Sequence, residues 1–422
     1  MANFQVKNPE ETEVLGEIEL TDPGDVAAIV EKARAARKSW SSRPVAERAA
    51  CLDAAADSLV PHQEELAKLL AAESGKPIAQ SDFEVGGGIH FLHGNAEEGR
   101  RLAGRVLPTE GNMGTEWDLA YTRREPLGVV AAILPFNFPV ELFIEKCAAA
   151  LVGGNAVVVK PPLEAPLVVE RFREAMIAAG IPADVLAAVH GGADVGAALA
   201  EAPGVDAISL TGSTAAGIAV AKATAHTLRF LHLELGGNNG CLILDDADLD
   251  LVAAEVTRGR LMMNGQACSA SKRLIVHRSL HDQLAAKLVD AVQAQRHGAA
   301  TDPDSTVGPL IHAGAAEKVA GQVANARSQG AEIAAGTGEA DGAYFAPTLL
   351  AGVPFDADIA RDDEIFGPVF NLIPVDSTEQ AIEVANSSSF GLMASVFSED
   401  PRRALHVGEE LESGGVVING SD

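Results

Sequence analysis

The chain has 422 residues, of which 47% are hydrophobic and 22% are charged, a composition typical of a folded globular protein rather than a disordered one. This length predicts two or three domains, at about 150 residues per domain, and allows a large buried core. The 59 acidic residues outnumber the 32 basic ones, and the formal net charge of −27 disfavours binding to nucleic acid or to a membrane surface, both of which are negatively charged.

The N-terminal part of the chain shows helical patterns. Asp22 and Pro23 are suited to the start of a helix, and a second helical pattern covers residues 45–60. A third pattern ends at the stop signal that begins with Gly75. We expect the three glycines at 86–88 to interrupt the helix that follows.

From residue 115 the pattern changes to strands. Apolar and polar residues alternate over 115–125, which predicts a strand with one face in water. After it, short β-rich runs alternate with helical stretches, which predicts βαβ units and a parallel, doubly wound sheet. The runs are 129–134, 156–160, 185–190, 207–210 and 230–235. Such sheets bind ligands at the carboxyl ends of their strands.

A second alternation of strands and helices begins after Gly237. It includes β-rich runs at 241–244 and 271–277 and closes with runs at 391–398 and 414–420. The sequence contains no internal repeat and no low-complexity linker. We therefore expect the two α/β halves to pack directly on each other, with the chemistry in a cleft between them.

The cysteines, the histidines and the apolar segments indicate whether the chain forms disulfides, binds a metal or enters a membrane. The four cysteines lie far apart and include no CxxC pair, so neither a disulfide framework nor a zinc ribbon is predicted. His90 and His93 lie one helical turn apart but lack a third metal ligand. The long apolar window at 140–159 contains Glu141 and Glu145, and the N-terminus has no basic segment followed by an apolar one. We expect no metal site, no signal peptide, no membrane span and a cytoplasmic location.

Two segments contain a candidate nucleophile and a candidate base. Cys268 lies in a polar, glycine-containing turn, where backbone N–H groups favour a thiolate; a buried, idle thiol is the alternative. Glu234 lies near the end of an apolar strand against two glycines, where partial burial favours a general base; the alternative is that it points outward on the polar face of the strand. Each segment alone leaves both interpretations open.

Three strand ends carry residues suited to a nucleotide or an oxyanion. Gly212 and Ser213 open a helix whose N–H groups can bind a pyrophosphate, or they are only a capped helix start. Lys160 can hydrogen-bond ribose or phosphate, or be solvated. Asn137, in a turn with two prolines, can donate its amide to an oxyanion or satisfy the turn. All these positions fall at strand ends of one α/β pattern.

Taken in order, these segments resemble the hallmark segments of the aldehyde dehydrogenase superfamily. The matching segments are LPFNFP (134–139), Lys146, VVVKPP (157–162), TGST (211–214), LELGG (233–237), GQAC (265–268) and EIFGP (364–368). The resemblance covers essentially the whole chain, and the combination of LELGG with GQAC is highly specific.

The resemblance implies an α/β fold with a Rossmann-like doubly wound parallel sheet, a second α/β catalytic domain and a small β oligomerisation arm. It implies a cofactor-binding domain at 1–114 and 129–236, the arm at 115–128 and the catalytic domain at 237–422. It also implies a homodimer or homotetramer.

The resemblance further implies NAD(P)-dependent oxidation of a small aldehyde to its carboxylic acid. In that reaction Cys268 attacks the aldehyde, the Asn137 amide and the Cys268 N–H stabilise the oxyanion, and hydride leaves for the nicotinamide to give a thioester. Glu234 activates the water that hydrolyses the thioester, and Lys146 supports proton movement away from Glu234. Because members that transfer the acyl group to CoA typically lack this glutamate, a free acid is the expected product.

The residues that the resemblance assigns to the cofactor come from both halves of the chain. Lys160 and Glu364 match ribose-binding residues, Phe366 packs near the nicotinamide, and Gly212 and Ser213 meet the pyrophosphate. The complete set is Phe136, Lys160, Gly212, Ser213, Leu235, Glu364 and Phe366.

Two features depart from the family pattern. Many NAD-preferring members have a glutamate three residues after the VVVK lysine, where this chain has Leu163 followed by Glu164; a carboxylate there would repel a 2′-phosphate, which gives a slight lean to NAD with NADP left open. The chain ends at VVINGSD (416–422), where relatives continue with a tail that pairs with a neighbouring subunit, and we expect weaker oligomers if that tail is absent.

The run from Cys268 to Arg273 looks closest to the lactaldehyde and non-phosphorylating glyceraldehyde-3-phosphate branch of the family. This likeness does not define which aldehyde is the substrate.

Two other interpretations stay open. A truncated, cofactor-binding homologue without turnover accounts for the fold and for the short C-terminal end. A cysteine-dependent esterase accounts for Cys268 and Glu234 but leaves the TGST, VVVKPP and EIFGP segments unexplained.

Overall fold

The computed structural model describes residues 3–109, 113–114 and 117–421, and the chain forms two compact units. The ranges in the first unit are Met1–Gln5, Glu17–Leu66 and Asp82–Glu234, and those in the second are Val6–Gly16, Ala67–Ser81 and Leu235–Asp422. The segments 6–16 and 67–81, which the resemblance assigns to the cofactor-binding domain, thus belong to the second unit. Side chains of that unit hold both segments: the Tyr344 hydroxyl donates to Glu10 at 2.6 Å, and Asn264 Nδ2 donates to the Gly75 carbonyl at 2.8 Å.

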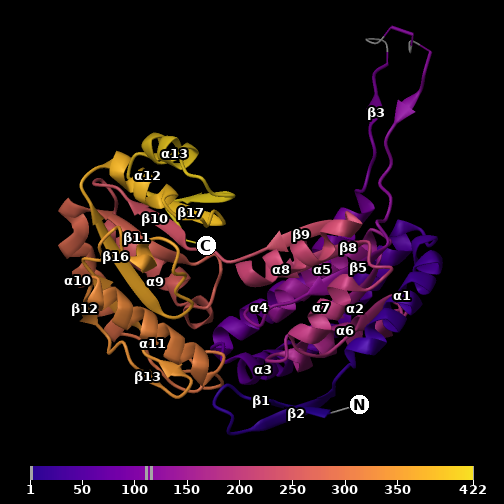
Figure 1. The fold of residues 1–422 in the computed structure, drawn as a ribbon, viewed down its shortest axis with the longest axis horizontal. Coiled ribbons are helices and arrows are strands. Elements are labelled where there is room, and N and C mark those ends of the chain that lie inside the picture. Colours follow the sequence, from indigo (N-terminus) through magenta and orange to yellow (C-terminus); the bar gives the residue numbers. More distant parts are fainter. Residues whose placement is uncertain (1–2, 110–112, 115–116, 422) are drawn as a thin grey trace. The chain divides into compact units, whose positions relative to one another are not determined.

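A five-stranded parallel sheet forms the centre of the first unit (Figure 1). Its strands, in spatial order, are β7 (Leu186–Ala188), β6 (Ala156–Lys160), β5 (Val129–Ile133), β8 (Ala207–Thr211) and β9 (Phe230–Glu234). Each lies within or close to a predicted run. Every residue of β6 is buried, because helices cover both faces, and this explains its uninterrupted apolar sequence before Lys160.

Helices connect and cover these strands. They are α1 (Val26–Ser41), α2 (Val45–Leu59), α4 (Ile78–Arg100), α5 (Pro139–Val152), α6 (Pro166–Ala178), α7 (Ala193–Glu201) and α8 (Thr214–Thr224). Helix α3 (Gln63–Ser74) begins in this unit, but its residues 67–74 belong to the second. The chain order along the sheet reverses at β5: β6 and β7 lie to one side, and β8 and β9 to the other. The carboxyl ends of β5 and β8 therefore flank a topological switch point, where open α/β sheets bind ligands.

A seven-stranded sheet forms the centre of the second unit. Its order is β12 (Glu332–Ala335), β15 (Thr348–Ala351), β16 (Val369–Val375), β11 (Ser271–His277), β10 (Asn239–Ile243), β17 (Met393–Phe397) and β18 (Gly415–Ile418). β12 pairs with β15 antiparallel, and the other neighbours pair parallel. The predicted α/β class is confirmed for both units, whereas β12, β15 and β16 escaped the sequence analysis.

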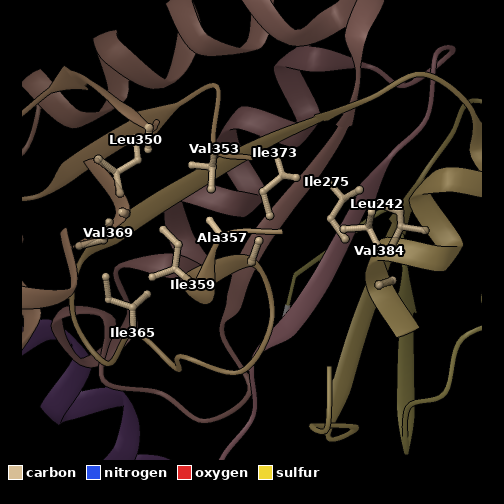
Figure 2. Packing of buried hydrophobic residues seen from close by; sticks show 14 of the residues in the cluster. Leu242, Ile275, Leu350, Val353, Ala357, Ile359, Ile365, Val369, Ile373 and Val384 are labelled. Atoms are coloured by element: carbon tan, nitrogen blue, oxygen red, sulfur yellow. The ribbon is translucent and has the colours of Figure 1, made fainter. Parts of the chain in front are cut away.

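Side chains on the two faces of this sheet enter two separate cores. Leu242 and Ile275 point into one cluster with residues of α11 (Ala313–Ser328), α12 (Thr378–Asn386) and α13 (Pro401–Glu409) (Figure 2). Their neighbours Cys241 and Leu274 enter the other cluster with α9 (Leu249–Arg260) and α10 (His281–Gln293). Since successive side chains of a strand point to opposite faces, a strand covered on both faces favours apolar residues at consecutive positions rather than at alternate ones.

Short hairpins complete the described chain. They pair β1 (Asn3–Lys7) with β2 (Val14–Glu19), β3 (Val106–Leu107) with β4 (Ala120–Tyr121), and β13 (Ala340–Asp341) with β14 (Tyr344–Phe345). The sequence predicts only helices in the N-terminal part, so β1 and β2 are a correction. Among the described residues, no helix is both long enough and apolar enough to cross a membrane.

The hairpin of β3 and β4 extends away from the sheet of its unit (Figure 1). The predicted strand over 115–125 with one wet face is wrong for its described part, because only Ala120 and Tyr121 form a strand. Trp117, Leu119 and Tyr121, the expected buried face, are 98%, 77% and 68% exposed, since no other described part of the chain covers them. Residues 115–116 of that prediction lie outside the described residues.

The expected helix break at residues 86–88 is wrong, because α4 continues through all three glycines. A Cβ atom built on Gly88 would lie 2.6 Å from Val140 Cγ1 of α5, whereas one on Gly87 would have no neighbour within 4 Å. Gly88 therefore allows α4 and α5 to approach each other closely. This contact offsets the poor helix propensity of glycine within α4.

This contrast predicts opposite effects of two adjacent substitutions. Gly87→Ala should raise the free energy of unfolding by about 0.5–1 kcal/mol, through helix propensity alone. Gly88→Ala should lower it by about 1–3 kcal/mol, because the new methyl group overpacks against Val140. Urea denaturation of the two variants and the parent chain measures both changes. A stabilised Gly88→Ala variant would show that the two helices can separate at little cost.

Candidate functional site

The carboxyl edge of the first sheet brings several predicted site residues onto neighbouring strand ends. The Leu134 N–H donates to the Lys160 carbonyl at 3.1 Å, which joins the ends of β5 and β6. The Gly212 N–H donates to the Glu234 carbonyl at 3.0 Å, which joins the ends of β8 and β9. The turn that contains Asn137 follows β5 directly, so these residues share one edge of one sheet.

The turn between β5 and α5 is held by a carboxylate from another helix. The Glu84 side chain of α4 accepts the N–H groups of Val140 and Glu141 at 2.9 and 3.3 Å, in the first turn of α5. An acceptor there satisfies otherwise unpaired N–H groups, and its charge favours the helix dipole. Asn137 lies just before this anchored turn and is 4% exposed. Its backbone is thus fixed, as an oxyanion donor requires.

The start of α8 shows a helix cap together with an unused hydroxyl group. The Ser213 Oγ accepts the Ala216 N–H at 3.2 Å. Ser213 therefore caps the helix, as the alternative of a capped helix start without a ligand predicts. Thr211 Oγ1, one residue before Gly212, is buried and makes no hydrogen bond with the described residues. Since buried hydroxyl groups normally find a partner, the strand end fits a polar ligand as well as a cap.

Lys160 lies in an acidic environment at the end of β6. Its side chain is buried, and this burial lowers the pKa of Lys160, while the carboxylates of Glu164 and Asp194 oppose the shift. The Lys160 Nζ donates to the Pro161 carbonyl at 3.3 Å. Lys160 is therefore not solvated, and it forms no close ion pair with the residues that the structure describes; the negative charges of Glu164 and Asp194 act on it nonetheless.

Glu234 and Lys146 lie in one polar cluster of the first unit. The Glu234 side chain is 45% exposed, and its Oε1 lies 3.5 Å from His232 Nε2. Burial lowers the pKa of Lys146, whereas the charges of Glu145 and Glu234 raise it. Burial also raises the pKa of Glu145, a carboxyl group that the sequence analysis did not single out. Glu234 is thus more exposed than a mainly desolvated base would be.

The turn that leads to Cys268 has a strained backbone. Met263, Asn264 and Gly265 have φ values of 49°, 56° and 80°, in the left-handed region. The Asn264 side chain holds this turn, with Nδ2 donating to the carbonyls of Gly75 and Pro309 and Oδ1 accepting the Gly308 N–H, all at 2.8 Å. Strain of this kind persists only where the surroundings over-determine it, and it is typical of functional sites.

A second polar side chain joins that turn to the EIFGP segment. Arg260 is fully buried and donates to the carbonyls of Gly265 at 3.1 Å and Ile365 at 2.9 Å, and also to that of Gly367. A Cβ atom on Gly265 would lie 2.2 Å from the Gly367 carbonyl carbon, so only glycine permits this approach. Arg260 and Asn264 thus fix the turn before Cys268 from both sides.

The thiol of Cys268 is half-buried, and burial raises its pKa. The positive charge of Lys272 and hydrogen bonds from the backbone N–H groups of Ser269 and Cys268 lower it, as the sequence predicts, but burial is the larger effect. The Cys268 carbonyl accepts from Asn239 Nδ2 at 2.7 Å. The loop is therefore ordered through its carbonyl, and the thiol remains partly accessible.

Lys272 brings three of the predicted segments together. Its Nζ donates to Cys268 O and to Glu364 Oε1, both at 2.9 Å, and to the Gly237 carbonyl; it also lies 5.5 Å from the centre of the Phe366 ring. Leu235 is half-buried just before this glycine turn. Sequence reasoning missed Lys272, and the available signal was a pair of adjacent charged residues, Lys272 and Arg273, in the strand run SKRLIVH.

Comparisons with known proteins agree on one family. The family model described as "Aldehyde dehydrogenase family" matches residues 1–422. Among curated relatives, the 3,6-anhydro-alpha-L-galactose dehydrogenase of Streptomyces coelicolor is 36% identical over 98% of this chain and 84% of its own length. The NADP-dependent succinate-semialdehyde dehydrogenase GabD of Escherichia coli is 34% identical over 99% of this chain and 86% of its own. A solved NADP complex of the NADP-dependent glyceraldehyde-3-phosphate dehydrogenase of Bacillus halodurans superposes with a TM-score of 0.95 at 35% identity, over 100% of this chain and 88% of that one.

The burial of Cys268 predicts its reactivity. The rate of its alkylation by iodoacetamide should still be rising at pH 9.0, the ordinary thiol pKa, because burial raises the pKa of Cys268. Cys147 and Cys241 are fully buried and should stay unmodified in the folded chain, which provides an internal control. Mass spectrometry of peptides from a pH series measures each site. A plateau of the Cys268 rate below pH 8 would contradict the burial effect.

Proposed function

Since this chain belongs to the aldehyde dehydrogenase family and is an NAD(P)-dependent enzyme that oxidises an aldehyde to its acid, we propose that Cys268, Glu234, Asn137 and Lys146 carry the reaction. The observation that supports this most directly is the Lys272 cluster, in which the nucleophile loop and the Glu364 carboxylate share one ammonium donor. A nucleophile and a cofactor-binding carboxylate are thereby fixed relative to each other within one unit.

The cofactor residues fit a dinucleotide on features of this chain. The N–H groups at the start of α8 and the unused Thr211 hydroxyl suit a pyrophosphate, with Gly212 and Ser213 at the turn. Lys160 and Glu364 would hold the two riboses, and Phe136, Leu235 and Phe366 would contact the nicotinamide end. Bound NAD(P) supplies the acceptor for the two electrons that leave the aldehyde carbon.

The residues of the chain carry the remaining steps. The Cys268 sulfur forms a bond to the aldehyde carbon, and the Asn137 amide with the Cys268 N–H donates to the oxyanion of the thiohemiacetal. After oxidation, a thioester links the acyl group to Cys268. Glu234 accepts a proton from water, the hydroxyl group adds to the acyl carbon, and the thiolate leaves as the carboxylic acid forms. Lys146, which lies near Glu234, supports the onward movement of that proton.

The roles of the two units and the assembly follow the same proposal. The first unit binds the cofactor, the second carries the nucleophile, and the hairpin of β3 and β4 is an oligomerisation arm of a homodimer or homotetramer in the cytoplasm. The exposed apolar side chains of Trp117, Leu119 and Tyr121 support a partner for the arm, because isolated hairpins rarely expose such groups to water. The substrate is a small aldehyde of the lactaldehyde or glyceraldehyde-3-phosphate kind, which the name of the Bacillus halodurans relative supports.

Two variants test the catalytic roles. Mixed with NAD or NADP and a panel of small aldehydes, the parent chain should give a steady rise in absorbance of the reduced nicotinamide. Cys268→Ala should abolish this rise together with any esterase activity, because it removes the nucleophile. Glu234→Gln should give a burst of reduced cofactor followed by slow turnover, because only deacylation loses its base.

The alternatives predict different results in the same assay. A cysteine-dependent esterase would hydrolyse esters equally well after Lys160→Ala, whereas a dehydrogenase should lose cofactor affinity. A cofactor-binding homologue without turnover would bind NAD or NADP in calorimetry and give no rise with any aldehyde. A normal steady-state rate in Glu234→Gln would remove Glu234 from the mechanism.

For the choice of cofactor, we propose a slight preference for NAD. Glu164 and Asp194 place negative charge near Lys160, where it would oppose a 2′-phosphate. The double variant Glu164→Gln with Asp194→Asn should lower the KM for NADP several-fold relative to that for NAD. Asp184→Asn, which neutralises an exposed carboxylate of the same unit, is the control. A parent chain that already uses NADP better than NAD would contradict the preference.

A further inference from the structure

Lys272 is a charged residue in an unusual position. It lies in β11, a central strand, and its side chain is fully buried. A buried ammonium is unfavourable unless it is paired and hydrogen-bonded. The reaction steps above make no use of it, so its retention in this strand calls for a separate explanation.

Each N–H bond of the ammonium has an acceptor from a different segment. The acceptors are the Gly237 carbonyl, the Cys268 carbonyl and Glu364 Oε1. Three donors with three acceptors use the full capacity of the group. The ammonium therefore joins the glycine turn, the nucleophile loop and the segment before β16, which are far apart in the sequence.

The orientation of Glu364 follows from these contacts. Its Oε1 accepts from both Lys272 Nζ at 2.9 Å and the Gly237 N–H at 3.2 Å. Its Oε2 faces Gly236, the first glycine of the turn, since a Cβ atom on Gly236 would lie 2.5 Å from that oxygen. Two donors on one oxygen fix the carboxylate plane and direct the other oxygen, as a carboxylate that binds a ribose requires.

From this geometry we propose that Lys272 is a positioning residue that holds Glu364 for the cofactor ribose and fixes the Cys268 loop, so that cofactor affinity and thiol reactivity both depend on its charge. The inference rests on the proposed roles of Cys268 and Glu364. Lys272 acts through these two residues and takes no part in bond formation.

The charges around Lys272 give the proposal a pH dependence. Burial lowers the pKa of Lys272 to about 8, with Glu364 opposing this shift and Arg260 adding to it. In turn, the ammonium lowers the pKa of Cys268. The cluster therefore carries its positive charge below about pH 8, and the hold on Glu364 weakens as the pH rises through that value.

Lys272→Met, which keeps a similar stem and removes the charge, tests the proposal in the full chain. Fluorescence titration with reduced NAD and reduced NADP at pH 7 should show affinity weakened about tenfold or more, the usual effect of losing a charge-assisted hydrogen bond. The rate of Cys268 alkylation by iodoacetamide at pH 7, where Lys272 carries its charge, should fall because the thiolate loses a neighbouring ammonium. Lys272→Arg should restore part of both properties. Lys318→Met, which removes an exposed lysine of the same unit, serves as the control and should leave both unchanged.

The outcomes separate this proposal from the proposed function. A folded Lys272→Met variant with parental cofactor affinity and a parental rate of Cys268 alkylation at pH 7 would overturn the positioning role, even if the parent chain oxidises aldehydes. A parent chain without aldehyde oxidation would refute the proposed function, while the alkylation rate at pH 7 still tests the link between Lys272 and Cys268. If Lys272→Met does not fold, the parent chain alone tests the positioning role. Its affinity for reduced cofactor should fall between pH 7 and pH 9, because Lys272 loses its charge around its pKa of about 8. A constant affinity over this range would overturn the proposal.

Discussion

Parallel strand pairing is the constraint on which the rest of this molecule depends. A parallel pair needs a crossover, the crossover helices cover the sheet, and all strands then end at one edge. In the first unit this edge carries Lys160, Gly212 and Glu234, at the ends of β6, β8 and β9. Burying these polar groups within the apolar strands would be unfavourable. They lie instead at the strand ends, where the backbone turns and its N–H groups are available as hydrogen-bond donors.

The second unit solves a different problem, which is to hold an irregular loop against a regular sheet. Consecutive left-handed residues precede Cys268, and buried polar side chains offset the cost of that backbone. Asn264, Arg260 and Lys272 each donate to carbonyl groups of other segments. Polar groups thus set the position of the Cys268 loop, whereas the apolar clusters set the position of the sheet.

Sequence alone predicted all five strands of the first sheet and β10, β11, β17 and β18 of the second. It missed β16, although nearly all of that strand is buried. It failed where tertiary contacts override local preference. The glycines of α4 read as a break, yet Gly88 is a point of contact between helices. The alternation near Tyr121 read as a half-buried strand, although the described chain offers nothing to bury it. Lys272 was missed because the run SKRLIVH does not show which carbonyl groups its lysine will meet, and those contacts join segments far apart in the chain.

The anchoring of Asn264 also affects the chemical durability of the chain. Asn264 precedes Gly265, and an Asn–Gly pair in a flexible chain deamidates readily, because the glycine nitrogen attacks the side-chain carbonyl and a succinimide ring closes. Here both ends of the carboxamide are held by hydrogen bonds, and the backbone is locked in the left-handed region. Ring closure would require those bonds to break, so the appearance of aspartate at this position measures how often the Cys268 loop opens during storage.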